Sequence, residues 1–184
     1  PLRYEDVPFG DEFSYLNGKT ENEDYKEGIY VGYRYYDSFR LPVRFPFGYG
    51  LSYTIFEIGV QEVRVQESLI TVSVMVTNTG NTFAGREVVQ VYLSAPEGEL
   101  EKEYQSLAAF AKTRELACGD SQLMQLTFDL RNMASYSEQK AQYLLEKGNY
   151  ILRVGNSSRN TTVAAVLQLD EAVTVSRLRH CCSA

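Results

Sequence analysis

The strongest constraint on the fold is an alternation of apolar and polar residues that begins near Glu57 and recurs along most of the chain. Successive side chains of a β-strand point to opposite faces, so a period of two predicts strands that bury one face. The apolar rows are Ile70, Val72, Val74 and Val76; Val89, Val91 and Leu93; Met124, Leu126, Phe128 and Leu130; Tyr150, Leu152 and Val154; and Val163, Ala165, Leu167 and Leu169.

About seven such strands, with turn residues between them and no crossover helices, predict an antiparallel β-sandwich of the immunoglobulin or fibronectin type III kind over residues 55–171. In the first strand the apolar positions change parity between Val60 and Val63. One extra residue near Gln61-Glu62, a β-bulge, would restore a common face. A capping-box pattern at Ser135-Tyr136-Ser137-Glu138 is the one hint of a helix in this region.

Residues 1–54 differ, because they are rich in tyrosine, phenylalanine, glycine and proline and have little periodicity. We expect one strand at Val31 to Tyr36, and neither helix nor central strand at Phe45 to Gly50. A segment without repeated elements cannot build its own core, so we expect it to pack on something else. Residues 172–184 form a predicted tail or linker that begins with a strand-like stretch, Ala172 to Val175.

Charge and composition argue against several classes of function. The chain has 18 basic and 24 acidic residues, a net charge of −6, and no basic run, which argues against nucleic-acid binding. No apolar stretch approaches the roughly 20 residues of a membrane helix. Because the chain starts with Pro1 rather than Met, we expect it to be an internal or processed piece.

The cysteines predict no disulfide framework and no metal site. Three cysteines cannot form a closed set of disulfides, so we expect free thiols and a cytoplasmic rather than a secreted or periplasmic location. His180-Cys181-Cys182 suggests metal ligation, but a site needs a fourth ligand at suitable spacing and none lies nearby. Gly48 and Gly50 lack the strand-to-helix context of a phosphate loop, so no cofactor is predicted.

Two motifs are too specific for composition to explain. The first is YKEGIYVGYRYYD at residues 25–37, followed by FPFGYGLSYT at 45–54. The second joins VTNTG at residues 76–80 to AGREVVQVYL at 84–93. In sequence and spacing the chain resembles the C-terminal part of glycoside hydrolase family 3 enzymes of the β-glucosidase or β-xylosidase kind. The resemblance implies the tail of an α/β sandwich domain and a linker at 1–54, followed by a fibronectin type III-like domain.

The resemblance also implies a retaining hydrolase of β-linked sugars as the longer enzyme, called the parent below. Such chemistry needs two carboxyl groups about 5–5.5 Å apart. In this family the Asp nucleophile lies in a Ser-Asp-Trp-like run on a (β/α)8 barrel, and this chain has no Trp. The family's acid/base Glu lies upstream of the YVGYRYY motif, and no glutamate there matches its context. The glutamates available are Glu5, Glu12, Glu21, Glu23 and Glu27. We therefore assign no catalytic residue to the chain.

Arg34, Tyr35 and Asp37 are the candidate substrate-binding residues. The tyrosines around them could stack on a sugar or be buried in an interface, and Arg34 and Asp37 could form an ion pair or lie near a sugar pocket. Three function classes remain open at this point: a non-catalytic part of a glycosidase, with the remaining domains of the parent as partners; an independent carbohydrate-binding sandwich; and an adhesive module. The motif at residues 25–37 and 45–54 favours the first, because a free module has no use for the tail of an α/β domain.

Overall fold

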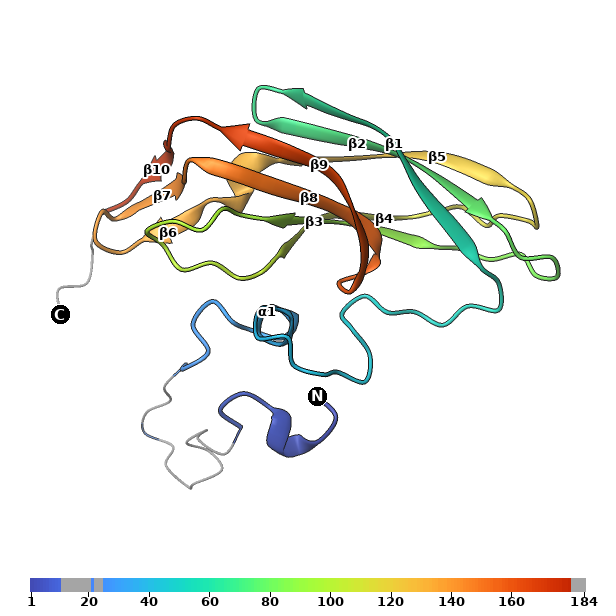
Figure 1. Ribbon diagram of the computed structural model, residues 1–184, viewed down its shortest axis with the longest axis horizontal. Coiled ribbons are helices and arrows are strands. Elements are labelled where there is room, and N and C mark those ends of the chain that lie inside the picture. Colours follow the sequence, from blue (N-terminus) through green and yellow to red (C-terminus); the bar gives the residue numbers. More distant parts are fainter. Residues whose placement is uncertain (11–20, 22–24, 180–184) are drawn as a thin grey trace.

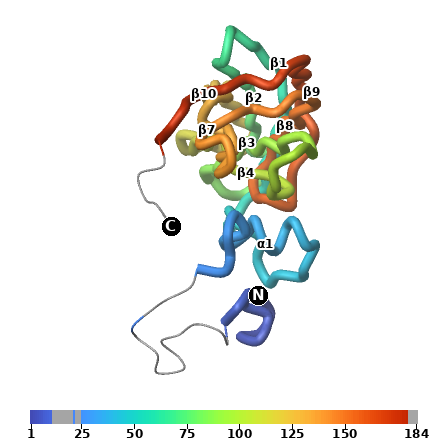
Figure 2. Tube along the Cα trace, turned by 90° about the vertical axis from the view of Figure 1, so that its left-hand side faces the viewer, coloured from blue at the N-terminus to red at the C-terminus, as the bar shows by residue number. Residues whose placement is uncertain are grey.

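The computed structural model describes residues 1–10, 21 and 25–179. It consists of an antiparallel β-sandwich with an N-terminal segment packed against its outside (Figures 1 and 2). The strands are β1 (Phe56–Gln66), β2 (Leu69–Asn78), β3 (Val88–Ser94), β4 (Ser106–Lys112), β5 (Ser121–Asp129), β6 (Ser135–Ser137), β7 (Gln142–Leu145), β8 (Gly148–Ser157), β9 (Asn160–Leu169) and β10 (Val173–Arg177). The helical elements are the 3-10 turns η1 (Tyr4–Asp6) and η3 (Leu130–Met133) and the helix α1 (Tyr33–Ser38).

Two sheets form the layers of the sandwich, one of order β1-β2-β5 and one of order β4-β3-β8-β9, while a small β10-β7-β6 sheet lies at one end (Figure 1). The predicted rows meet between the layers. Val74 and Val76 of β2, Val91 of β3 and Leu152 of β8 are fully buried in one aliphatic core. The predicted antiparallel β-sandwich is therefore confirmed.

The predicted β-bulge lies in β1. Val60 pairs with Val74 and Glu62 pairs with Ser73, so Gln61 is the extra residue. The row predicted in β9 is wrong at Val163, whose side chain is 56% exposed. The β8–β9 register shifts between Ala165 and Val163, and this second bulge turns Val163 away from the core.

Two predictions of local structure are wrong. The capping-box pattern begins no helix, because Ser135–Ser137 is β6 and pairs with β7. The strand expected at Val31 to Tyr36 is instead helix α1. Its N-cap residue Gly32 has φ 62° and ψ −129°, a conformation that breaks an extended chain and suits glycine.

The strand-like stretch predicted at the start of the C-terminal tail is present as β10, which pairs with β7. The domain limits 1–54, 55–171 and 172–184 remain predictions. The His180-Cys181-Cys182 run lies outside the described residues. Within those residues no helix is long and apolar enough to cross a membrane.

Strand β3 is buried on both faces, although the alternation predicts only one. Val89, Val91 and Leu93 face the core, while Gln90 and Tyr92 face outward and are also buried. Residues 25–55, called the junction segment below, cover this outer face (Figure 2). The segment therefore packs on the sandwich of its own chain.

Candidate functional site

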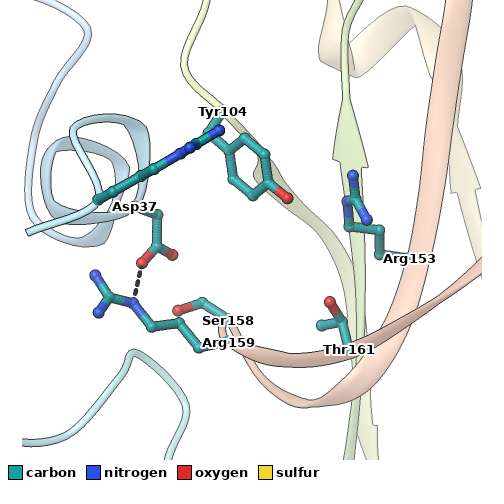
Figure 3. A pocket seen from close by; sticks show the side chains of 7 residues that line it. Asp37, Tyr104, Arg153, Ser158, Arg159 and Thr161 are labelled. Atoms are coloured by element: carbon teal, nitrogen blue, oxygen red, sulfur yellow. Dashed lines mark hydrogen bonds and ion pairs between the residues drawn. The ribbon is translucent and has the colours of Figure 1, made fainter.

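The junction segment is fixed to the sandwich by a partly buried ion pair. Helix α1 places Asp37 against the β8–β9 turn, where the Arg159 Nε donates to Asp37 Oδ1 over 2.7 Å (Figure 3). The Arg159 NH2 group also donates to the carbonyls of Tyr36, at 3.0 Å, and Leu41, at 2.7 Å. The Asp37 side chain is only 5% exposed. One guanidinium thus connects the C-terminal half of α1 and the residues that follow it to the sandwich.

Gln105 adds a second connection at the same place. Its Nε2 donates to the Ser158 carbonyl, at 2.6 Å, and to Asp37 Oδ2, at 3.4 Å. Two polar atoms beside this network, Gln105 Oε1 and Ser158 Oγ, are buried and have no hydrogen-bond partner among the described residues.

The loop that follows α1 approaches β3 through a glycine. Gln90 Nε2 donates to the Gly48 carbonyl over 3.1 Å, and the Ser158 N–H donates to the Phe47 carbonyl over 2.8 Å. Gly48 has φ 80°, and a Cβ at this position would lie within 2.1 Å of the Gln90 amide. The backbone can therefore come this close only at glycine.

The three substrate-binding residues predicted from the sequence, Arg34, Tyr35 and Asp37, do not line one common pocket. Arg34 does not pair with Asp37, because its Nε lies 3.7 Å from Glu103 Oε1 while Asp37 bonds Arg159. The Tyr35 ring packs on Phe39, with centroids 4.8 Å apart. Of the three candidates only Asp37 lines the cleft described below.

The tyrosines around the candidates make packing and hydrogen-bond contacts within the chain. The Tyr33 ring stacks on Phe47, with centroids 4.5 Å apart and an angle of 16°, and its hydroxyl accepts from the Leu107 N–H over 2.8 Å. Tyr36 is buried and donates to the Asp6 carbonyl. Tyr92 lies beneath Tyr33, and burial raises its pKa far above the usual tyrosine value.

A cleft of about 490 Å³ opens beside the Asp37–Arg159 pair. It is lined by Asp37, Arg40, Tyr104, Arg153, Ser158, Arg159 and Thr161, and we call it the arginine cleft. Figure 3 shows Asp37 and Arg159 on one side and Arg153 and Thr161 on the other, with Tyr104 between them. Sequence reasoning missed this site, because its arginines lie in separate stretches that only the topology brings together.

A second buried ion pair, between Lys102 and Glu146, has a structural role. Their side chains are 9% and 11% exposed, and Glu146 also accepts from the backbone N–H groups of Glu99 and Leu100. Burial opposes ionisation of Glu146, but the Lys102 ammonium and these N–H groups outweigh it and lower its pKa. Among the described residues no group of three His, Cys, Asp or Glu side chains could bind a metal ion.

Large apolar side chains of the junction segment remain on the surface. We call this set the aromatic face; its members are Phe45, Phe47, Tyr49, Leu51 and Tyr53, which are 45–92% exposed. Next to it lies a hollow of about 270 Å³, lined partly by Phe47 and Phe110. Five large apolar side chains exposed within residues 45–53 are a feature of interaction surfaces.

Comparison with known proteins identifies similar chains. Residues 87–158 match the model of the fibronectin type III-like domain family. The chain is 40% identical, over 86% of its length, to a β-glucosidase of Kluyveromyces marxianus. It is 38% identical, over 89% of its length, to an exo-α-(1->6)-L-arabinopyranosidase of Bifidobacterium longum. A solved β-glucosidase of Paenibacillus barengoltzii covers 97% of the chain, with a TM-score of 0.88 and 42% identity.

The matched region is a small part of each of these proteins. The chain spans 18% of the Kluyveromyces enzyme, 22% of the Bifidobacterium enzyme and 20% of the Paenibacillus chain. The match includes the junction segment as well as the sandwich, because 97% of the chain is covered in the Paenibacillus structure.

Proposed function

Because the chain belongs to the C-terminal, fibronectin type III-like region of glycoside hydrolase family 3 enzymes, we propose that it gives structural support to the catalytic domains of a parent β-glycosidase. The relatives are several times longer than this chain, so the other domains of the parent are its partners. In this proposal the chain contributes no catalytic residue.

The observation that supports this role is that the junction segment is both fixed and apolar at its surface. It is fixed to the sandwich through Arg159, Gln90 and Tyr33, by contacts of 2.7–3.1 Å. The same segment leaves the side chains of the aromatic face exposed to solvent. A segment that is held in place and has an apolar surface suits a connector that a neighbouring domain covers.

We propose that the parent hydrolyses β-linked glucosides or xylosides. Its two catalytic carboxyl groups would come from domains outside this chain. The region described here is 40% identical to part of a β-glucosidase and 38% identical to part of an exo-α-(1->6)-L-arabinopyranosidase, which act on different sugars. We therefore place the choice of sugar in the parent's other domains.

The test is an assay of the purified chain with aryl β-glucosides and aryl β-xylosides. The chain alone should show no turnover above a buffer blank, while the full-length parent should hydrolyse at least one of these substrates. Turnover that persists through repurification of the chain would contradict the non-catalytic role.

A second experiment tests the support itself. Deletion of this region from the parent should leave insoluble or inactive enzyme, because the neighbouring domains lose the aromatic face that covers their apolar surface. A deletion variant with unchanged melting temperature and activity would show that the region is dispensable, and would contradict the proposal. The independent binding or adhesive module has no observation in its favour.

A further inference from the structure

We propose that the arginine cleft is a binding site for a small molecule that contains a carboxylate or phosphate group. The cleft lies between α1, the β8–β9 turn and Tyr104 (Figure 3). This inference goes beyond the structural role proposed above and does not depend on it.

The first argument is the balance of charge. Three guanidinium groups line the cleft, from Arg40, Arg153 and Arg159, but Asp37 is the only acidic residue in its lining. Asp37 is already bonded to Arg159 at 2.7 Å. Two positive charges therefore remain in a chain whose net charge is −6. A local cation pair on an acidic protein attracts anions to this place.

The second argument is the position and hydrogen bonding of the Arg153 guanidinium. It is half-buried on the outer face of β8, with its guanidinium carbon 5.3 Å from the centre of the Tyr104 ring. Its Nε makes one long hydrogen bond, 3.4 Å, to Ser94 Oγ. Within the described part of the chain no carboxylate lies within 4.0 Å of it. Tyr104 thus positions a guanidinium whose terminal N–H groups are available to a ligand.

The third argument is the rest of the lining. Arg40 is exposed at the end of α1 and forms no ion pair with any residue that the structure describes. Ser158 and Thr161 add hydroxyl groups, and Ser158 Oγ is buried without a hydrogen-bond partner among the residues that the structure describes. A buried hydroxyl without a partner costs free energy, and rotation of this side chain would direct it toward a bound oxyanion.

These groups define the ligand class. Guanidinium groups bind carboxylate and phosphate through paired N–H donors, and hydroxyl groups complete the coordination of such oxygens. The cleft, at about 490 Å³, lies within the usual range of small-molecule sites and is larger than the anion alone requires. A sugar acid or a sugar phosphate fits both the charge and the size.

The experiment is calorimetric titration of the chain with three probes: inorganic phosphate, glucuronate and glucose. We expect saturable binding of phosphate, of glucuronate or of both, and none of glucose. The pattern identifies the source of the oxyanion, since glucuronate tests the sugar carboxylate and phosphate tests the tetrahedral anion.

Variants then locate the site. Arg153→Gln should weaken binding by about tenfold or more, and Arg40→Gln should weaken it by several-fold, because each removes a charge-assisted donor. Arg40 is exposed, so its substitution leaves folding intact and keeps the test valid if Arg153→Gln is unstable. Arg177→Gln, which makes the same charge change in β10, is the control and should bind as the original chain does.

Two results would overturn the proposal. One is the absence of saturable binding by both phosphate and glucuronate. The other is an equal loss of affinity in Arg177→Gln and Arg40→Gln, which would show that the anion responds to net charge and not to this cleft.

Discussion

The sandwich and the junction segment are stabilised in different ways. In the sandwich, side chains such as Val74 and Leu152 are fully buried between two sheets of the same chain. In the junction segment, Phe47 and Tyr49 remain 45% and 51% exposed, and the segment is fixed by a few directed contacts such as Asp37–Arg159. The sandwich therefore supplies its own core, whereas the segment depends on a neighbour.

The difference shows how one chain can be both a stable domain and a connector. Nondirectional burial over many residues gives the sandwich cooperative stability. Hydrogen bonds to Arg159 and Gln90 give the segment a defined position with little core of its own. A segment of this kind can present a surface in fixed orientation, which is what an interface between domains requires.

The largest expected effect is in the sandwich core. Leu152→Ala should lower the free energy of unfolding by about 2–5 kcal/mol, because it removes a fully buried side chain and leaves a cavity. Urea denaturation followed by circular dichroism measures the loss. Val166→Ala on the neighbouring strand, where the side chain is 56% exposed, should change stability by less than ~0.5 kcal/mol. Equal losses in both variants would contradict the two-sheet core.

The second-largest effect should differ between the chain alone and the full-length parent. Phe47→Ala should lower the free energy of unfolding by about 2–4 kcal/mol in the parent, where other domains cover the ring, and by about 1 kcal/mol in the chain alone. The reason is that Phe47 is 45% exposed here although it stacks on Tyr33. The Michaelis constant for substrate should change little. The same loss in both proteins would show that no other domain covers this ring.

The difference between the two regions also determines which elements of the fold can be predicted from the sequence. Alternation is a local signal, so the rows of β2, β3 and β8 and the bulge at Gln61 can be read from neighbouring residues. The bulge that exposes Val163 could not, because it depends on pairing with β8. Helix α1 was also missed, since its tyrosines favour a strand and its helical form depends on Gly32 and on contacts with the sandwich.

The candidate site depends on contacts between distant parts of the chain. Asp37 and Arg159 are 122 positions apart, and no local pattern connects them. One weak signal was available: polar Gln90 and Ser94 flank Tyr92 at alternate positions of the VVQVYLS stretch, and their face is buried too. A tyrosine with polar neighbours on the outer face of a strand can indicate that another segment packs there.

A smaller and more local effect is expected at the ion pair of the junction. Asp37→Asn removes the carboxylate charge that pairs with Arg159. It should lower the free energy that holds the junction segment on the sandwich by about 1–3 kcal/mol, because the hydrogen bond to this nearly buried side chain loses its charge. The loss should appear as faster amide exchange and faster proteolysis in residues 25–55, with the sandwich amides unchanged. Glu62→Gln, which breaks the exposed pair with Arg64, is the control and should leave both measurements as they are. Slower cleavage in Asp37→Asn would contradict the role of this pair.

The smallest effect concerns pH and belongs to the sandwich. Lys102 and the backbone donors of the 99–100 loop outweigh burial and lower the pKa of Glu146 below its usual value of 4.5. A carboxyl group whose pKa is lower in the folded state binds fewer protons there than in the unfolded chain, so it stabilises the fold above pH 4.5. This contribution should be lost as pH falls below 4.5 and through the lowered pKa. Glu146→Gln should therefore flatten the decline of unfolding free energy with acidification, while Glu57→Gln, at an exposed position of β1, should leave the slope unchanged. Parallel curves of unfolding free energy against pH for the original chain and Glu146→Gln would show that the ionisation of Glu146 contributes nothing to stability.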